Sequence, residues 1–478
     1  MDILDMTLCE LVAALDGGGV SSTEATAACL NRIKDTQGLN SFITVCEDAA
    51  TDAARRADER RARGERAPLL GVPVAVKDNI VTDGIRTTCA SKFLQNFVPP
   101  YDATVVQKLK AAGAVIVGKT NMDEFAMGST NENSAYGVVK NALDPARVPG
   151  GSSGGSANCV AARQAFAALG SDTGGSIRQP AAYCGVVGLK PTYSAVSRYG
   201  LIAFASSLDQ IGTLTRDCDD ALAMLKVLSG KDERDATSAC PPAYPDILRG
   251  DVRGKTLCIA DEFLNTDKLD DGVRAAFEAA VDALQKRGAV IKRASIKSFA
   301  AALSVYYVLS GAEASSNLAR FDGVKYGMRA EGCDSISDIY VKSRTEFFGA
   351  EVKRRIMTGN YVLSSGYYDA YYLKASKIRT VIKKEFYAAL DGCDAIISPT
   401  APTVAPKLGE QSDPHKTYLS DMYTVPVNIS GLPAVSVPFG AAHGMPVGVQ
   451  IIGKCFDEGG ILDIGKAVML ADREVHNA

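Results

Sequence analysis

Two loops rich in serine and glycine, with one lysine far upstream, are the segments of this chain best suited to chemistry. The first loop covers residues 149–156 and reads PGGSSGGS, and the second covers residues 170–178 and reads GSDTGGSIR. The lysine is Lys77, which follows the apolar residues 72–76. Segments of this composition form either flexible loops or anion-binding turns that hold a nucleophile.

The second loop has the pattern of a nucleophile beside an oxyanion site. Glycine permits a tight turn there, and successive backbone N–H groups from Thr173, Gly174, Gly175 and Ser176 would converge on a carbonyl oxygen that gains negative charge. The hydroxyl of Ser176 would attack the same carbonyl. A Gly-Gly-Ser sequence alone is more often an ordinary turn, so this interpretation requires a base nearby.

The histidines do not supply that base. The chain has only three, in contexts typical of a loop, a turn and a chain end: His415, His443 and His476. A buried lysine can replace histidine, because burial disfavours the ammonium form and lowers the pKa. Lys77 is therefore the candidate base, and the alternative is an ordinary solvated lysine at a strand end.

Ser152 lies in the first loop, whose composition resembles a flexible linker. Linkers join domains, however, whereas this loop lies between segments expected to belong to one sheet and has no polar tract on either side. We therefore expect a compact, glycine-dependent turn that brings Ser152 close to another part of the backbone.

The elements that must position these loops indicate an α/β protein. The first 65 residues are expected to be helical, with capping boxes that begin at Thr7 and Ser21. Beyond them, helical patterns alternate with strand-like segments, which argues for a sheet covered by helices on both faces. Residues 228–255 hold three prolines and are expected to form a surface connection. Strands are expected at 70–76, 114–118, 165–170, 256–260, 288–293, 394–398, 433–438 and 446–452, and helices at 104–112, 271–287 and 457–473.

Composition narrows the class of protein. The chain has 478 residues, 46% of them hydrophobic, with a net charge of −3 and a pI of about 5.8. This balance gives no general attraction to nucleic acid or to an anionic membrane, and no apolar run is long enough to span one. The start of the chain is acidic, so we expect no secretory signal, and the twelve cysteines include no CxxC pair. We therefore expect free thiols and a cytoplasmic location.

The two loops and the residues that follow them resemble the signature segment of the amidase signature family. The match continues through residues 180–192, which read PAAYCGVVGLKPT. The resemblance implies a single α/β domain over residues 1–478, with a central mixed sheet and helices on both faces. It also implies a catalytic triad of Lys77, Ser152 and the nucleophile Ser176, with Ser152 after a cis peptide bond.

Three further segments resemble one branch of this family, the glutaminase subunits of glutamyl-tRNA(Gln) amidotransferases. They are residues 119–129, 313–323 and 353–357. The resemblance implies hydrolysis of glutamine within a cytosolic heterotrimer that also contains a B (kinase and transamidase) subunit plus a small C subunit. The ammonia would convert Glu-tRNA(Gln) to Gln-tRNA(Gln). The partner subunit would use ATP and Mg²⁺, because this chain has no GxxxxGK[ST] motif; no cofactor or metal is expected in this chain.

The same resemblance implies which residues bind the substrate. They are Met127, Gly128, Arg355, Asp421 and a tyrosine, either Tyr306 or its neighbour Tyr307. Glutamine is a zwitterion, so a selective site needs a cation for the carboxylate and an anion for the ammonium group. Arg355 and Asp421 meet that need, although Arg355 considered alone would more often be a surface cation.

Two alternatives to a glutaminase subunit stay open. One is a stand-alone amidase that hydrolyses a different amide, and such an enzyme would not need Arg355 and Asp421 together. The other is a scaffold subunit whose triad is vestigial, against which the intact Lys77, Ser152 and Ser176 argue.

Overall fold

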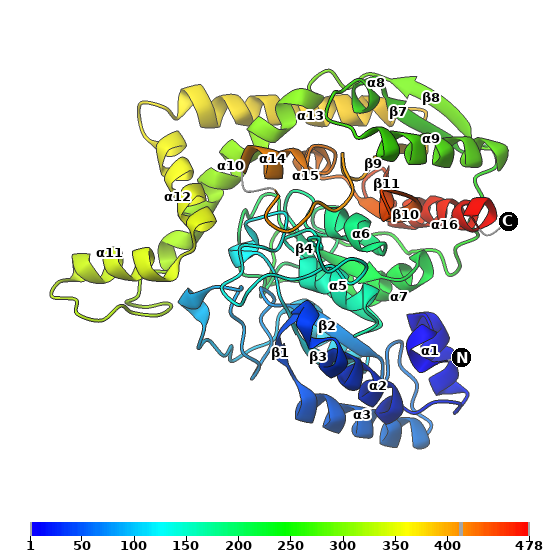
Figure 1. Cartoon of the computed structure of the whole chain (residues 1–478), viewed down its shortest axis with the longest axis horizontal. Coiled ribbons are helices and arrows are strands. Elements are labelled where there is room, and N and C mark those ends of the chain that lie inside the picture. Colours follow the sequence, from blue (N-terminus) through cyan, green and yellow to red (C-terminus); the bar gives the residue numbers. More distant parts are fainter. Residues whose placement is uncertain (1, 411–413, 477–478) are drawn as a thin grey trace.

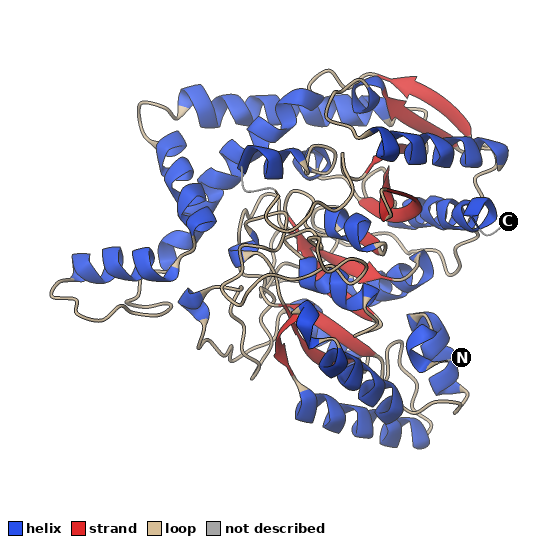
Figure 2. Cartoon of the chain, viewed as in Figure 1, coloured by secondary structure: helices blue, strands red, loops and turns tan. Residues whose placement is uncertain are grey.

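One mixed sheet runs through the molecule. A computed structural model of the chain describes residues 2–410 and 414–476. Its 11 strands have the order β1-β3-β2-β4-β6-β5-β10-β11-β9-β7-β8, and helices flank the sheet on both faces, as predicted (Figures 1 and 2). The strands are β1 (Phe42–Val45), β2 (Pro73–Lys77), β3 (Val115–Thr120), β4 (Ala167–Asp172), β5 (Val187–Lys190), β6 (Gln210–Thr215), β7 (Thr256–Ala260), β8 (Val290–Ala294), β9 (Ala395–Pro399), β10 (Ala434–Ala442) and β11 (Met445–Ile452).

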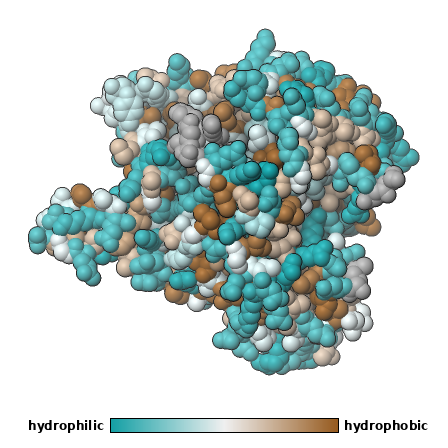
Figure 3. All heavy atoms as spheres, viewed as in Figure 1, coloured by the Kyte–Doolittle hydropathy of each residue, from teal (hydrophilic) through white to brown (hydrophobic). Residues whose placement is uncertain are grey.

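Helices form the outer layers, and α11 extends away from the body of the molecule (Figure 1). The face shown in Figure 3 is mostly hydrophilic, with hydrophobic residues scattered over it. The helices are α1 (Leu8–Asp16), α2 (Ser22–Asp35), α3 (Glu47–Ala62), α4 (Thr104–Ala111), α5 (Gly154–Ala161), α6 (Arg178–Cys184), α7 (Cys218–Leu228), α8 (Asp261–Leu264), α9 (Asp271–Lys286), α10 (Ala302–Asn317), α11 (Ile336–Phe347), α12 (Ala350–Leu363), α13 (Lys374–Ala389), α14 (Pro414–Leu419), α15 (Val425–Ser430) and α16 (Glu458–His476).

The alternation of side chains along the strands divides the core into layers. In β2, Val74 and Val76 pack into the cluster that includes α4, α7, α9 and α16. Ala75 faces the opposite side and packs into the cluster that includes α3, α5 and α6. Every residue of β2 and β4 is buried, which explains why residues 73–76 and 167–169 read as continuous apolar runs rather than as alternating ones.

The N-terminal part is mostly helical, and both expected capping boxes form at the starts of α1 and α2. It also contains the short strand β1, which the sequence did not reveal and which pairs antiparallel with β3. Between α7 and β7 the chain forms no named helix or strand. His415 was expected in a loop but lies in α14. None of the helices in the described parts of the chain has both the length and the apolar composition needed to cross a membrane.

Candidate active site

The geometry of two neighbouring strands brings Lys77 next to the second serine loop. Strands β2 and β4 pair in parallel, with Val76 opposite Leu169. Their carboxyl ends therefore meet at one edge of the sheet, where β2 ends in Lys77 and β4 leads into Ser171 and Asp172. The first loop reaches the same edge because its last three residues begin α5, which packs against both strands.

Lys77 is fully buried among serine side chains. Its Nζ lies 2.8 Å from Ser152 Oγ, 2.8 Å from Ser153 Oγ and 2.9 Å from Ser171 Oγ. It also lies 3.3 Å from the carbonyl oxygen of Ser171. The structure therefore brings the predicted base into contact with the predicted middle serine, and the alternative of a solvated lysine is wrong.

Burial sets the protonation of Lys77. It lowers the pKa of the ammonium group from its usual value to about 7, against the opposing attraction of three nearby carboxylates, Asp123, Asp172 and Asp209. A lysine with such a pKa is neutral in a large share of molecules at neutral pH, and it can then accept a proton.

The first loop is a compact, buried turn, as expected. The Gly151–Ser152 peptide bond is cis. A Cβ atom on Gly151 would lie 2.0 Å from Asp123 Oδ2 and 3.0 Å from the backbone N of Asn131, so only glycine fits there. The N–H of Ser153 donates to the carbonyl oxygen of Ser176 at 3.1 Å, which fixes the two serine loops side by side.

Of the three predicted triad residues, the proposed nucleophile has the most access to solvent. Ser176 is 8% exposed, whereas Lys77 and Ser152 are 0% exposed. This order suits a relay in which the base and the middle hydroxyl lie behind the residue that meets the substrate.

One of the four predicted oxyanion donors is already engaged. The N–H of Gly175 donates to Asp172 Oδ1 at 2.8 Å, so it holds the turn in shape rather than pointing at a ligand. Within the described residues, the N–H groups of Thr173, Gly174 and Ser176 have no acceptor. These three remain available to an oxyanion.

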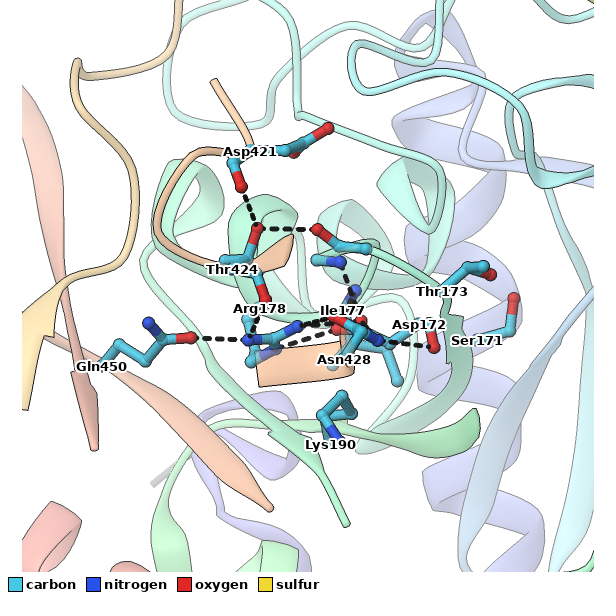
Figure 4. A network of polar contacts seen from close by, with 12 residues as sticks. Ser171, Asp172, Thr173, Ile177, Arg178, Lys190, Asp421, Thr424, Asn428 and Gln450 are labelled. Atoms are coloured by element: carbon cyan, nitrogen blue, oxygen red, sulfur yellow. Dashed lines mark hydrogen bonds and ion pairs between the residues drawn. The ribbon is translucent and has the colours of Figure 1, made fainter. Parts of the chain in front are cut away.

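A buried ion pair supports the second loop from behind (Figure 4). The Arg178 guanidinium donates to both carboxylate oxygens of Asp172, each at 3.0 Å. It also donates to the side chains of Asn428 and Gln450 and to the carbonyl oxygen of Thr424. Burial alone would raise the pKa of Asp172, but Arg178 outweighs it and holds that pKa at about 2. The carboxylate therefore stays ionised and keeps accepting the N–H of Gly175.

Arg355 lies on α12 and is a buried cation, not a surface one, with 5% exposure. Its Nε donates to Glu351 Oε1 at 2.7 Å. Its guanidinium carbon lies 4.5 Å from the ring centre of Tyr307 and 5.1 Å from that of Tyr418. Its Nη1 has no hydrogen-bond partner among the described residues, so it offers a buried donor for an anion.

Asp421 lies between α14 and α15 and offers the complementary acceptor. Its Oδ2 accepts the hydroxyl of Ser129, while its Oδ1 has no partner in the described parts of the chain. Burial raises the pKa of Asp421 to about 8, although Ser129 and the charge of Arg355 oppose the rise. A bound ammonium group would stabilise the ionised form. The Thr424 hydroxyl donates to the carbonyl oxygens of Gly174 and Asp421 (Figure 4). Thr424 thereby connects Asp421 to the second loop.

Both candidate tyrosines border the site from α10, at different places. Tyr306 lies against the second loop, since a Cβ atom on Gly174 would come within 2.6 Å of its ring. Tyr307 lies against Arg355, and its ring stacks on Tyr418 at 4.0 Å between centres. Tyr306 is therefore next to the predicted oxyanion turn, and Tyr307 is next to the cation.

The remaining predicted residues come from the segment after β3. Met127 is fully buried. A Cβ atom on Gly128, whose φ is +154°, would lie 2.4 Å from the carboxyl carbon of Asp123. Gly128 also borders a cavity of about 280 Å³, whose lining includes Ser129, Glu351 and Tyr418. This cavity adjoins the residues that contact Arg355 and Asp421.

Several residues of the site were not singled out from the sequence. Ser153 and Ser171 lie in the predicted loops, but only the structure shows that they contact Lys77. Asn79 follows Lys77 by two residues and reaches Ser171. Glu351 precedes Arg355 by four residues, a helical pairing that the sequence could have indicated. The described parts of the chain contain no cluster of histidine, cysteine, aspartate or glutamate able to hold a metal ion.

Sequence comparison finds full-length relatives. A family model described as Amidase matches residues 24–462. The A subunit of the glutamyl-tRNA(Gln) amidotransferase from Caldanaerobacter subterraneus subsp. tengcongensis is 52% identical over 471 residues, which cover 98% of this chain and 96% of that protein.

Comparison with solved structures also finds relatives of nearly the same length. A crystal structure of the corresponding A subunit, from the glutamyl-tRNA(Gln) amidotransferase of Thermotoga maritima, is 41% identical, with a TM-score of 0.80, and the match covers 98% of this chain and 95% of that one. The native peptide amidase of Stenotrophomonas maltophilia is 30% identical, with a TM-score of 0.83 and coverage of 98% and 97%. The likeness thus extends over nearly the whole chain in both cases.

Proposed function

The chain belongs to the amidase family, and within it we propose that the chain is the glutaminase subunit of a tRNA-dependent amidotransferase. The observation that carries this proposal is a pair of buried ionic atoms, Arg355 Nη1 and Asp421 Oδ1, that have no hydrogen-bond partner within the described residues. Thr424 joins Asp421 to the second serine loop. A free N–H donor on a buried cation and a free oxygen on a buried carboxyl group suit the carboxylate and ammonium of an amino acid. The relatives named as the A subunit of such an amidotransferase support the same conclusion.

In the proposed reaction, neutral Lys77 takes a proton from Ser152 as Ser152 takes one from Ser176. The freed Oγ of Ser176 attacks the side-chain carboxamide carbon of glutamine. The C–N bond then breaks, and the proton returns from Lys77 through Ser152 to the departing ammonia. A water molecule hydrolyses the γ-glutamyl ester and releases glutamate. The 2.8 Å contact between Lys77 and Ser152 supports this relay.

Backbone donors of the second loop would stabilise the tetrahedral intermediate. We assign this role to the N–H groups of Thr173, Gly174 and Ser176, which have no acceptor within the described residues. Donors fixed in advance cost no reorganisation when negative charge develops on the oxygen. Gly175 contributes by holding the turn through its bond to Asp172.

Substrate recognition would use both charged residues at once. Arg355 would bind the α-carboxylate and Asp421 the α-ammonium group, with Tyr306 against the bound chain. Met127 and Gly128 would close the pocket on the side of the segment after β3. Such a clamp fixes the orientation of the reacting amide as well as its affinity.

The ammonia would serve partner subunits. We propose a heterotrimer with a B (kinase and transamidase) and a small C subunit in the cytoplasm, in which the partner uses ATP and Mg²⁺ to activate Glu-tRNA(Gln). This chain would then contribute glutamine hydrolysis alone, with no cofactor of its own.

Substitution of Ser176 tests this division of labour. In the co-expressed complex, Ser176→Ala should abolish amidation of Glu-tRNA(Gln) from glutamine, because no acyl-enzyme can form. The same complex should still amidate the tRNA from an added ammonium salt, since that reaction bypasses this chain. Both rates are measured on one preparation. Failure of the ammonium-dependent reaction in an intact complex would count against the proposal.

A further inference from the structure

Three serine hydroxyls surround the nitrogen of Lys77, yet the proposed relay needs only one of them to give up its proton. In the charged state, the three N–H bonds of Lys77 match the hydroxyl oxygens of Ser152, Ser153 and Ser171, which lie 2.8, 2.8 and 2.9 Å away. In the neutral state, Lys77 has two N–H bonds and one lone pair. One hydroxyl must then donate to that lone pair, and the identity of this hydroxyl decides whether the relay works.

Ser153 is excluded by its own hydrogen bond. Its hydroxyl donates to the carbonyl oxygen of Ser171 at 3.1 Å. The hydrogen of Ser153 is therefore committed elsewhere, and Ser153 Oγ accepts from Lys77 in both protonation states. Two candidates remain for the lone pair, Ser152 and Ser171.

Asn79 decides where Ser171, the second candidate, can donate its hydroxyl hydrogen. Its Nδ2 lies 2.9 Å from Ser171 Oγ, and its Oδ1 is buried with no partner within the described residues. Ser171 Oγ has only two side-chain neighbours at hydrogen-bond distance there, Asn79 and Lys77. While Nδ2 faces Ser171, the hydrogen of Ser171 can go only to the lone pair of Lys77, where it competes with Ser152.

Turning the amide removes this competition. A half-turn of Asn79 exchanges Nδ2 and Oδ1 with little change in shape. Oδ1 then accepts the Ser171 hydrogen, Ser171 accepts from Lys77, and the lone pair of Lys77 faces Ser152 alone. Within the described residues, either orientation leaves one end of the amide without a hydrogen-bond partner, so the two orientations differ mainly in what they do at Lys77.

We infer that Asn79 is a positioning residue that, with its Oδ1 turned toward Ser171, makes Ser152 the only hydroxyl able to pass its proton to Lys77. This inference rests on the proposed function, since it takes Lys77 as the base. The charged and titratable groups that act on Lys77 are Asp123 after β3, Cys89 after β2, Asp172 in the second loop, and Asp209, which accepts the hydroxyl of Thr173 in that loop. Within the described residues, the Asn79 side chain makes no hydrogen bond to any of the four.

A pair of variants tests the competition. Asn79→Leu keeps the number and branching of the side-chain heavy atoms but removes the acceptor, so Ser171 should compete for the lone pair and kcat/KM for glutamine should fall about tenfold, the scale of one hydrogen bond. Adding Ser171→Ala removes the competitor and should restore most of that loss. A purely structural role for Asn79 predicts that the double variant is as poor as Asn79→Leu or worse.

The pH profile gives a second readout. Asn79→Asp offers a carboxylate oxygen to Ser171 in either orientation, so the relay should persist. Its negative charge should raise the pKa of Lys77, which must be neutral to act, and should therefore move the acid limb of kcat/KM to higher pH, with activity recovered above it. A uniform loss of kcat/KM at every pH would overturn the inference.

A matched control separates this effect from loss of stability. Asn141 is also fully buried, and its amide donates to the carbonyl oxygens of Val148 and Tyr183. Ser171→Ala should not rescue Asn141→Leu.

All variants are assayed as the co-expressed complex, with thermal unfolding followed in parallel. An inactive wild-type complex would overturn the proposed function together with this inference, whereas an active wild type without rescue would overturn the inference alone.

Discussion

At the scale of single residues, burial changes the two most important ionisable groups in opposite directions. It lowers the pKa of Lys77 to about 7 and raises that of Asp421 to about 8. Both shifts favour the neutral form, as removal from water should. Lys77 is thereby suited to accept a proton. Asp421 is suited to ionise when a cation arrives, which couples its charge to substrate binding.

Asp421 distinguishes a glutaminase from an amidase of another amide. Asp421→Ala should remove the partner of the substrate ammonium and cost about 2 kcal/mol, or roughly thirtyfold in kcat/KM for glutamine. Glutaramate, which is glutamine without the α-amino group, should lose much less. Steady-state kinetics with both amides measure the difference. An equal loss for both would make Asp421 structural and favour the stand-alone amidase.

At the scale of elements, the parts of the site with local sequence signals could be predicted and the others could not. The strand that ends at Lys77 and the two glycine loops have strong local patterns, and the structure brings them together through the parallel pairing of β2 and β4. Helices α10 and α12, which pack against each other, were not predicted as elements. Residues on these two helices entered the predicted site only through the family resemblance.

The crossing of α10 and α12 sets the distance between Tyr306 and Arg355. The helices approach so closely that a Cβ atom on Gly359 would lie 2.0 Å from the carbonyl oxygen of Gly311. Gly359→Ala should push the helices apart and move Arg355, so KM for glutamine should rise more than kcat falls. Gly366→Ala is the control, since nothing lies within 4 Å of its Cβ position. Equal KM and kcat values for the two variants would show that the helix crossing does not position Arg355.

At the scale of the whole molecule, the site joins segments from both ends of the chain. Lys77 comes from β2, while Asn428 and Gln450, which hold Arg178, come from the last part of the sequence. No local pattern could predict such contacts, because they depend on the strand order of the complete sheet. The sequence therefore indicated the fold class and the serine loops, whereas the residues that support them became visible only in three dimensions.

The buried pair of Asp172 and Arg178 should matter for global stability. Asp172→Ala leaves the Arg178 charge buried without its partner and should lower the free energy of unfolding by about 3–5 kcal/mol. In the exposed pair of Arg55 and Glu59, Glu59→Ala should cost no more than about 0.5 kcal/mol. Urea unfolding measures both changes in free energy. Similar values for the two variants would contradict a stabilising role for the pair of Asp172 and Arg178.

The same pair predicts a pH dependence of stability. The folded-state pKa of Asp172 is about 2, below the usual value of about 3.9 for an unfolded chain. A depressed pKa contributes stability above the unfolded value, and this contribution is lost as the pH falls through about 4 toward 2. The wild type should lose more stability than Asp172→Ala over that interval, and parallel curves would argue against an ionised Asp172.

The central claim is that Ser176 forms a covalent γ-glutamyl ester, and the most direct test is to trap it. The complex is quenched with acid during turnover of glutamine, digested, and analysed by mass spectrometry. The account predicts a γ-glutamyl group on the peptide that carries Ser176, and its absence from the Ser176→Ala complex treated in the same way. Turnover with the group attached to another residue, or persisting in the Ser176→Ala complex, would contradict it.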